Sequence, residues 1–263
     1  MELTSAQIFT WIGGLFWPFI RLGAMLLASP VLGARMIPVR IRIVLALVMA
    51  WLIAPLLPPV PAVDPLSPAG ILITAQQVLI GVSMGFVLQM VFGAVVMAGQ
   101  NIAMSMGLGF ASALDPQNGV QVPVLSQFYM VITTLVFLAL DGQLVIIETL
   151  VQSFYLLPVG SAALSSDFIW QVVSWGSFMF VGSVLMAVPV MVSLLLVNLA
   201  FGVMTRASPQ LNIFAVGFPV TLLAGFVLLL FSLPALLPQL VSLFADAFAN
   251  LQDMLAMEAA RGP

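Results

Sequence analysis

Few side chains in this sequence could do chemistry, and most of those that could are carboxylates. The 263 residues include nine acids and six arginines, with no lysine, histidine or cysteine. Thiol chemistry, disulfides, Cys or His metal sites and imidazole catalysis are therefore excluded. Ser and Thr remain as nucleophiles, but the chain has no His or Lys to act as their base. No phosphate-binding or dinucleotide motif and no metal-ligand spacing occurs, so we expect neither enzymatic activity nor a cofactor.

One pair of acids has a helical spacing. Asp141 and Glu148 are seven residues apart in an apolar stretch, which places them two turns apart on one face of a helix. A pair of carboxylates inside a membrane could carry protons. The alternative, which we favour, is that both acids lie in a solvated loop and helix outside the bilayer.

A single arginine interrupts the first apolar stretch. Arg21 follows Pro18 by three residues. An arginine at the centre of a spanning helix costs roughly 2.5–3.5 kcal/mol to insert. Arg21 therefore either faces protein or a polar cavity, or it reaches a lipid headgroup from a shallow position. The sequence leaves both possibilities open.

The composition is that of a membrane protein. Hydrophobic residues make up 63% of the chain and charged residues 6%, and the mean hydropathy is +1.24. Soluble domains do not have this composition. We expect one all-α membrane domain over residues 1–263, with about six apolar helical segments in contact with lipid. Nucleic-acid binding is excluded because the chain has no basic surface to neutralise phosphates.

The arginines predict the orientation of the chain. Arg35, Arg40 and Arg42 lie together in the first loop, and Arg206 lies in a later turn. By the positive-inside rule both loops are cytoplasmic. Acids fall in the alternate connections and in the tail, so we expect both termini on the outer side.

Several apolar segments are too long for straight spans. Residues 69–98 would form a helix of about 45 Å, against about 30 Å of hydrocarbon, and residues 168–205 are also too long. Such segments must tilt, protrude or bend, and Pro189 predicts a kink. We expect the last span, 213–233, to end at Pro234 and Pro238, with an amphipathic tail beyond.

Small residues recur every four positions in residues 69–98. This spacing places them on one helix face and allows close approach of another helix. A glutamine in the same stripe indicates that the stripe meets protein and not lipid. The predicted helix-packing stripe consists of Gly81, Gly85, Gln89 and Gly93.

The stretch from Gly99 to Phe128 combines glycines, prolines and glutamines between long apolar segments. Residues of these types at this density break a helix. Asp115 to Gly119 is predicted to form a turn, because Pro116 presets φ and Asn-Gly tolerates positive φ. Irregular backbone between membrane helices must be an exposed connector or line a watery pore.

Methionines crowd the start of this stretch. Met97, Met104 and Met106 could form a deformable seal around different cargoes, because methionine adapts to irregular surfaces. The alternative is ordinary core filling, which is the commoner role of methionine.

Three motifs together resemble the FliR family of flagellar export proteins, which is related to virulence-system proteins of the SpaR type. They are residues 104–128, residues 197–214, and Trp17 to Arg21 with the loop 35–42. The resemblance covers nearly the whole chain. It implies a component of the type III export gate in the bacterial inner membrane, within the flagellar basal body.

The resemblance also implies partners and an internal organisation as bent or kinked helical hairpins within the gate. One FliR joins several FliP and FliQ subunits in a closed helical pore, with FlhB at the cytoplasmic side. The chain would consist of a FliP-like part, about residues 1–165, and a FliQ-like hairpin, about residues 166–263. Its central loop would be the pore plug, formed by Met104, Met106, Gly107, Gly109, Phe110, Asp115, Pro116, Asn118 and Gly119.

The resulting hypothesis is a gated conduit for unfolded export substrates, in which the loop seals the channel at rest and moves aside for substrate. A seal of apolar residues and glycines has few fixed contacts and opens readily. Two rivals remain: a secondary transporter that binds a small solute at a broken helix, and a purely structural nucleator of gate assembly.

Overall fold

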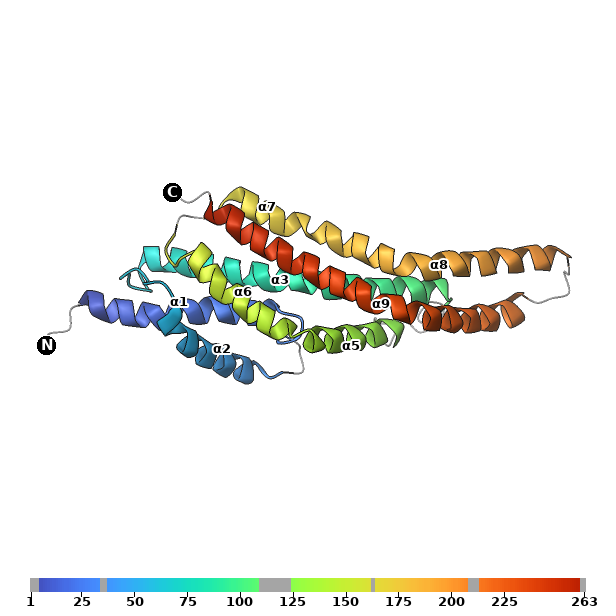
Figure 1. Cartoon of the computed structure of the whole chain (residues 1–263), viewed down its shortest axis with the longest axis horizontal. Helices are drawn as coiled ribbons and strands as arrows, with labels where there is room; N and C mark the ends of the chain where they lie inside the picture. The colour runs from blue at the N-terminus through green and yellow to red at the C-terminus, as the bar shows by residue number, and fades with distance from the viewer. Residues whose placement is uncertain (1–4, 34–36, 109–123, 162–163, 208–212, 261–263) are drawn as a thin grey trace. The chain divides into compact units, whose positions relative to one another are not determined.

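The chain is all-helical in the computed structural model, which describes residues 5–33, 37–108, 124–161, 164–207 and 213–260. No β-strand occurs in these ranges. In chain order (Figure 1) the helices are α1 (Ser5–Ala28), α2 (Val39–Ile53) with a 3-10 turn (Ala54–Leu56), α3 (Pro68–Ser105), α5 (Val124–Ala139), α6 (Gly142–Leu156), α7 (Ser166–Ser174), α8 (Gly176–Ala207) and α9 (Ile213–Ala259).

The helices confirm the predicted number of membrane segments. Among the described residues, five helical segments are long and apolar enough to cross a bilayer, and α5 with α6 makes a sixth as a bent pair. The bend between these two helices is 64°. It lies at Asp141, whose φ of 54° is in the left-handed region. The loop expected at Asp141 from the acids in this apolar stretch is therefore present as a sharp bend.

The start of the irregular central stretch was predicted too early. Residues from Gly99 to Ser105 belong to α3, which has 38 residues. Gly99 is helical because α5 packs against it: a Cβ at this position would lie 2.7 Å from the Cα of Ser126. The Ser126 hydroxyl also donates a hydrogen bond of 3.0 Å to the carbonyl of Val96. Glycine here allows close helix packing and does not break the helix.

The predicted end of the last span was also wrong. Helix α9 continues through Pro219, Pro234 and Pro238 to Ala259. A proline inside a helix costs roughly 3 kcal/mol, but burial of one apolar face offsets this cost. The predicted amphipathic character of the tail is confirmed, because apolar side chains recur at helical spacing and are buried: Leu240, Leu243, Phe244, Ala247, Leu251, Met254 and Leu255.

The chain divides into two compact units, each with its own core. The first comprises residues 1–90, 138–176 and 245–263, and the second comprises residues 91–137 and 177–244. In the first unit, α1 and α2 pack against each other. In the second, three phenylalanine rings form a cluster: Phe137 is 5.3 Å from Phe244, and Phe92 lies 5.9 Å and 5.8 Å from these two rings.

Candidate functional site

Arg21 is held by buried hydrogen bonds to distant parts of the first unit. It lies in α1 and is fully buried. Its Nε donates to the Gln77 side-chain oxygen at 2.8 Å, and one terminal nitrogen donates to the Leu157 carbonyl at 2.8 Å. The other donates to the Ser153 carbonyl at 2.9 Å and to the Ser153 hydroxyl at 3.0 Å. The possibility that Arg21 reaches a lipid headgroup is therefore excluded.

These contacts explain how a positive charge is tolerated inside apolar segments. The acceptors are neutral oxygens, and two of them are carbonyls at the C-terminal end of α6, where the helix dipole is negative. The guanidinium carbon also lies 4.0 Å from the centre of the Phe154 ring, which adds a cation–π attraction. Arg21 therefore joins α1 to α3 through Gln77 and to the end of α6.

Two glycines of the predicted stripe bring α3 close to α1 beside this arginine. A Cβ at Gly81 would collide with the backbone carbonyl of Arg21 and lie 2.9 Å from the Cβ of Ala24. A Cβ at Gly85 would lie 2.8 Å from the Met25 carbonyl. Because real Cβ atoms essentially never approach this closely, these two positions require glycine for the observed helix contact.

The other two residues of the stripe lie elsewhere. Gln89 is exposed, so its side chain does not extend the contact between α3 and α1. Gly93 belongs to the second unit. A Cβ there would lie 2.8 Å from the sulfur of Met179 in α8. The four residues thus follow one periodic pattern, but only Gly81 and Gly85 pack against the same helix, α1.

Two methionines of the predicted plug lie at the end of α3, one exposed and one buried. Met104 is 65% exposed, whereas Met106 is 1% exposed. A Cβ at Gly225 in α9 would lie 2.6 Å from the side chain of Met106, so the glycine makes room for this methionine. Gly107 follows with a φ of 83°, a conformation that favours glycine. The helix therefore ends at a point that packing and backbone conformation both fix.

The remaining residues of the predicted plug lie outside the described residues. They are Gly109, Phe110, Asp115, Pro116, Asn118 and Gly119.

The predicted cytoplasmic arginines lie at the ends of helices, except Arg35, which is outside the described residues. Arg40 and Arg42 are in the first turn of α2. Arg40 is exposed, and Arg42 is half-buried and donates to the Ile37 carbonyl at 2.8 and 3.1 Å. Arg206 is exposed in the last turn of α8, where a positive charge stabilises the helix dipole.

Asp141 and Glu148 do not form a buried pair. Both side chains are exposed. Asp141 precedes α6 as its N-cap residue, and Glu148 accepts a hydrogen bond of 3.3 Å from Gln152. The two carboxylates therefore do not form a buried proton-carrying pair within this chain.

The fold brings together polar partners that were not predicted from the sequence. Gln77 and Ser153 are polar residues within apolar helices, which is the signal that could have identified them. Glu258 was assigned only to an acidic tail. Its carboxylate accepts hydrogen bonds from the backbone of Ser165 at 2.7 Å and from the Ser165 hydroxyl at 2.5 Å. Ser165 in turn caps α7 by accepting from the backbone of Phe168.

The described contacts hold helices together and fix the end of α3. Comparison with known proteins identifies the family of the chain. A family model described as "Bacterial export proteins, family 1" matches residues 12–247. The chain is 36% identical to the flagellar biosynthetic protein FliR of Escherichia coli strain K12 over 256 residues, covering 97% of this chain and 98% of that protein.

Two further relatives carry the same name. The chain is 28% identical to the FliR of Bacillus subtilis strain 168 over 242 residues, which covers 91% of this chain and 93% of that protein. The FliR of Pectobacterium carotovorum is 36% identical over 255 residues, with 97% coverage of each chain. The resemblance predicted from three sequence motifs is confirmed, and the chain belongs to the FliR family of bacterial export proteins.

Proposed function

We propose that this chain forms part of the gated conduit of the flagellar type III export gate, together with FliP, FliQ and FlhB, in the bacterial inner membrane. Family membership over nearly the full length supports a role in the flagellar export apparatus. Unfolded export substrates would pass, and the segment from Met104 to Gly119 would seal the channel at rest.

The way in which α3 ends supports a plug in the segment that follows it. Met106 is buried against Gly225, and Gly107 turns the backbone out of the helix. The segment that follows is thus attached to a fixed point. Met104, one turn earlier, presents a flexible apolar side chain on the exposed surface. A fixed attachment next to glycines and exposed methionine suits a seal that must yield to varied cargo.

The exposure of the apolar helices supports assembly with other subunits. The spanning windows of α2, of α7 with α8, and of α9 are only 17%, 33% and 22% buried within the chain. Lipid or protein must cover such surfaces. The division into a FliP-like part, residues 1–165, and a FliQ-like hairpin, residues 166–263, would let both parts continue a ring of homologous subunits.

The direct test replaces residues 109–119 by a glycine–serine linker of the same length in the full chain, expressed with the rest of its operon. Two quantities are measured: the mass of the complex that co-purifies with the tagged chain, and the ion permeability of the cell membrane. A plug predicts a complex of unchanged mass and a membrane that leaks ions. The unaltered chain at the same expression level is the control.

The same experiment distinguishes the plug from the two alternative functions. Loss of the complex would favour a structural nucleator, since the segment would then be needed for assembly. An intact complex with no leak would contradict the plug. A solute transporter predicts instead that the purified chain alone moves a small solute across a vesicle membrane, which a gate subunit would not do.

A further inference from the structure

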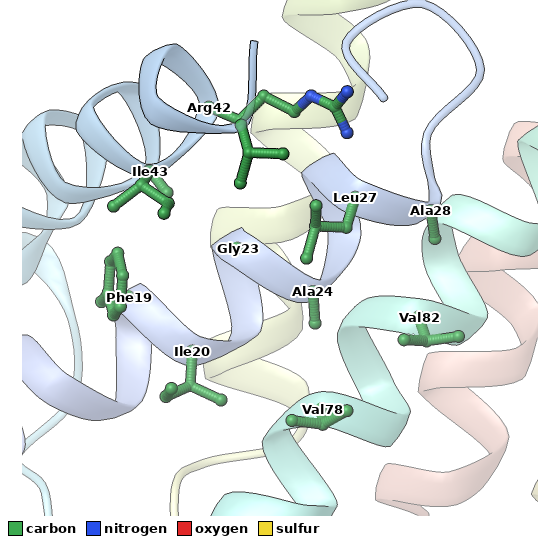
Figure 2. A pocket seen from close by; sticks show the side chains of 12 residues that line it. Phe19, Ile20, Gly23, Ala24, Leu27, Ala28, Arg42, Ile43, Val78 and Val82 are labelled. Atoms are coloured by element: carbon green, nitrogen blue, oxygen red, sulfur yellow. The ribbon is translucent and has the colours of Figure 1, made fainter. Parts of the chain in front are cut away.

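A pocket of about 530 Å³ opens between α1, α2 and α3 in the first unit. Figure 2 shows Phe19 and Ile43 facing each other across it from α1 and α2, with Val82 on the wall formed by α3. This volume is in the range of about 300–1,000 Å³ typical of small-molecule sites. The pocket is therefore large enough for a ligand and not merely a packing defect.

The pocket has open space at its base because of a glycine. Gly23 lines the pocket, and a Cβ added there would meet no atom within 4 Å. Gly81 and Gly85, which admit a neighbouring helix, differ in this respect. Gly23 therefore leaves room that no described part of the chain fills.

The lining is apolar apart from one guanidinium. Of the described residues that line the pocket, Arg42 alone is charged. Figure 2 shows its side chain extending over the end of the pocket near Leu27. Two of its nitrogens donate to the Ile37 carbonyl. An arginine at the edge of an apolar pocket matches a ligand with an apolar body and an anionic head.

The position of Arg42 in α2 indicates that the anionic head of the ligand is a lipid headgroup. Helix α2 begins at Val39 and the apolar span runs to Leu56, so Arg42 is about 5 Å from the start of the span at 1.5 Å per residue. Arginines at this depth lie at the headgroup level of a bilayer. The first turn of α2 has no acid, so two arginines there oppose the helix dipole. A negative group on Arg42 would stabilise this charge and the helix end.

We propose that this pocket binds a phospholipid, with one acyl chain between α1, α2 and α3 and the phosphate on Arg42. Around the mouth of the pocket, Leu27, Ile43 and Val82 are 58%, 51% and 40% exposed. An acyl chain can therefore enter from the bilayer side without leaving hydrocarbon. The lipid would fill the space beside Gly23 and hold α2 against α1.

The test uses the full chain in its native membrane, where any subunits that assemble with it are present. Cells that express the tagged chain are fed a fatty acid with a photoactivatable diazirine, which they build into their phospholipids. After illumination, the chain is purified and its cross-linked peptides are mapped by mass spectrometry. We expect cross-links to concentrate on the pocket-facing residues of α1, α2 and α3, including Leu27 and Val82.

Four substitutions make the test specific. Gly23→Leu fills the pocket, and its matched control Gly14→Leu places the same side chain in the same helix, also where a Cβ meets nothing within 4 Å. Arg42→Gln removes the charge, and Arg40→Gln removes an exposed charge in the same turn that does not line the pocket. We expect Gly23→Leu and Arg42→Gln to reduce pocket cross-links about tenfold, equal to about 1.4 kcal/mol, and both controls to leave them unchanged.

Two results would overturn the proposal. Cross-links spread evenly over the exposed face of α2, and unaffected by Gly23→Leu, would mean that only ordinary surrounding lipid is present. Cross-linking of a photoreactive amino acid at Gly23 to another polypeptide would mean that a protein fills the pocket. The cross-link map of the unaltered chain decides between these even if a variant fails to accumulate.

Discussion

The buried guanidinium of Arg21 shows how one residue can set the arrangement of three helices. It donates to Gln77 in α3 and to the Ser153 and Leu157 carbonyls at the end of α6. Each buried acceptor that loses its donor costs about 1–3 kcal/mol. The residue therefore contributes to stability through the groups that it satisfies and not through an ion pair.

Arg21→Met should destabilise the chain by about 2–4 kcal/mol, because it leaves several buried oxygens without a donor. The measurement is the midpoint of thermal unfolding of the purified chain in mild detergent. Arg40→Met, at an exposed position in α2, is the control and should change the midpoint little. Equal effects of the two substitutions would show that the Arg21 contacts are not important for stability.

The partner can be tested independently. Gln77→Leu should cost about 1–3 kcal/mol, because the Arg21 Nε–H then lacks its acceptor. In the background of Arg21→Met the same change should cost much less. A double-mutant cycle measures this coupling, and strict additivity of the two effects would contradict a direct interaction.

At the scale of helices, close packing of α3 on α1 depends on glycine. Gly81→Ala places a Cβ against the Arg21 carbonyl and should cost about 1–3 kcal/mol, as overpacking does. Gly14→Ala in α1 meets nothing within 4 Å, so it should stabilise the helix by up to about 1 kcal/mol. A lower midpoint of thermal unfolding for Gly81→Ala and a higher one for Gly14→Ala would confirm the contact. A higher midpoint for both variants would contradict it.

A second connection ties the start of α7 to the end of α9. Glu258 accepts two hydrogen bonds from Ser165, the N-cap of α7. Glu258→Ala should cost about 1–2 kcal/mol, since it removes charge-assisted hydrogen bonds and weakens the cap. Limited proteolysis should show faster cleavage between α6 and α7. Asp253→Ala, at an exposed position on the same helix, should leave the cleavage rate unchanged.

The sequence was sufficient to predict the helical segments and the break at Asp141, because apolar length and local turn residues determine both. It was not sufficient to predict the ends of α3 and α9. There, packing around Gly99 and along the buried face after Pro238 outweighs the local preference of glycine and proline. The partners of Arg21 lie 56 and more residues away in the chain, so only the fold could identify them.

At the scale of the whole molecule, the chain has more apolar surface than it can cover itself. The spanning windows of α2 and α9 are 17% and 22% buried. We therefore expect the chain to be degraded quickly when it is expressed without the other proteins of its operon. A pulse-chase measurement of its half-life with and without them would show this. A half-life that does not depend on them would contradict the expectation.

We propose that this chain works inside an export gate. The most direct test is to co-express the tagged chain with the FliP and FliQ of the same operon and to measure the mass of what co-purifies in mild detergent. The proposal predicts one discrete complex that contains a single copy of this chain and several copies of each partner. A monodisperse chain with no partner bound would contradict it and would favour an independent transporter.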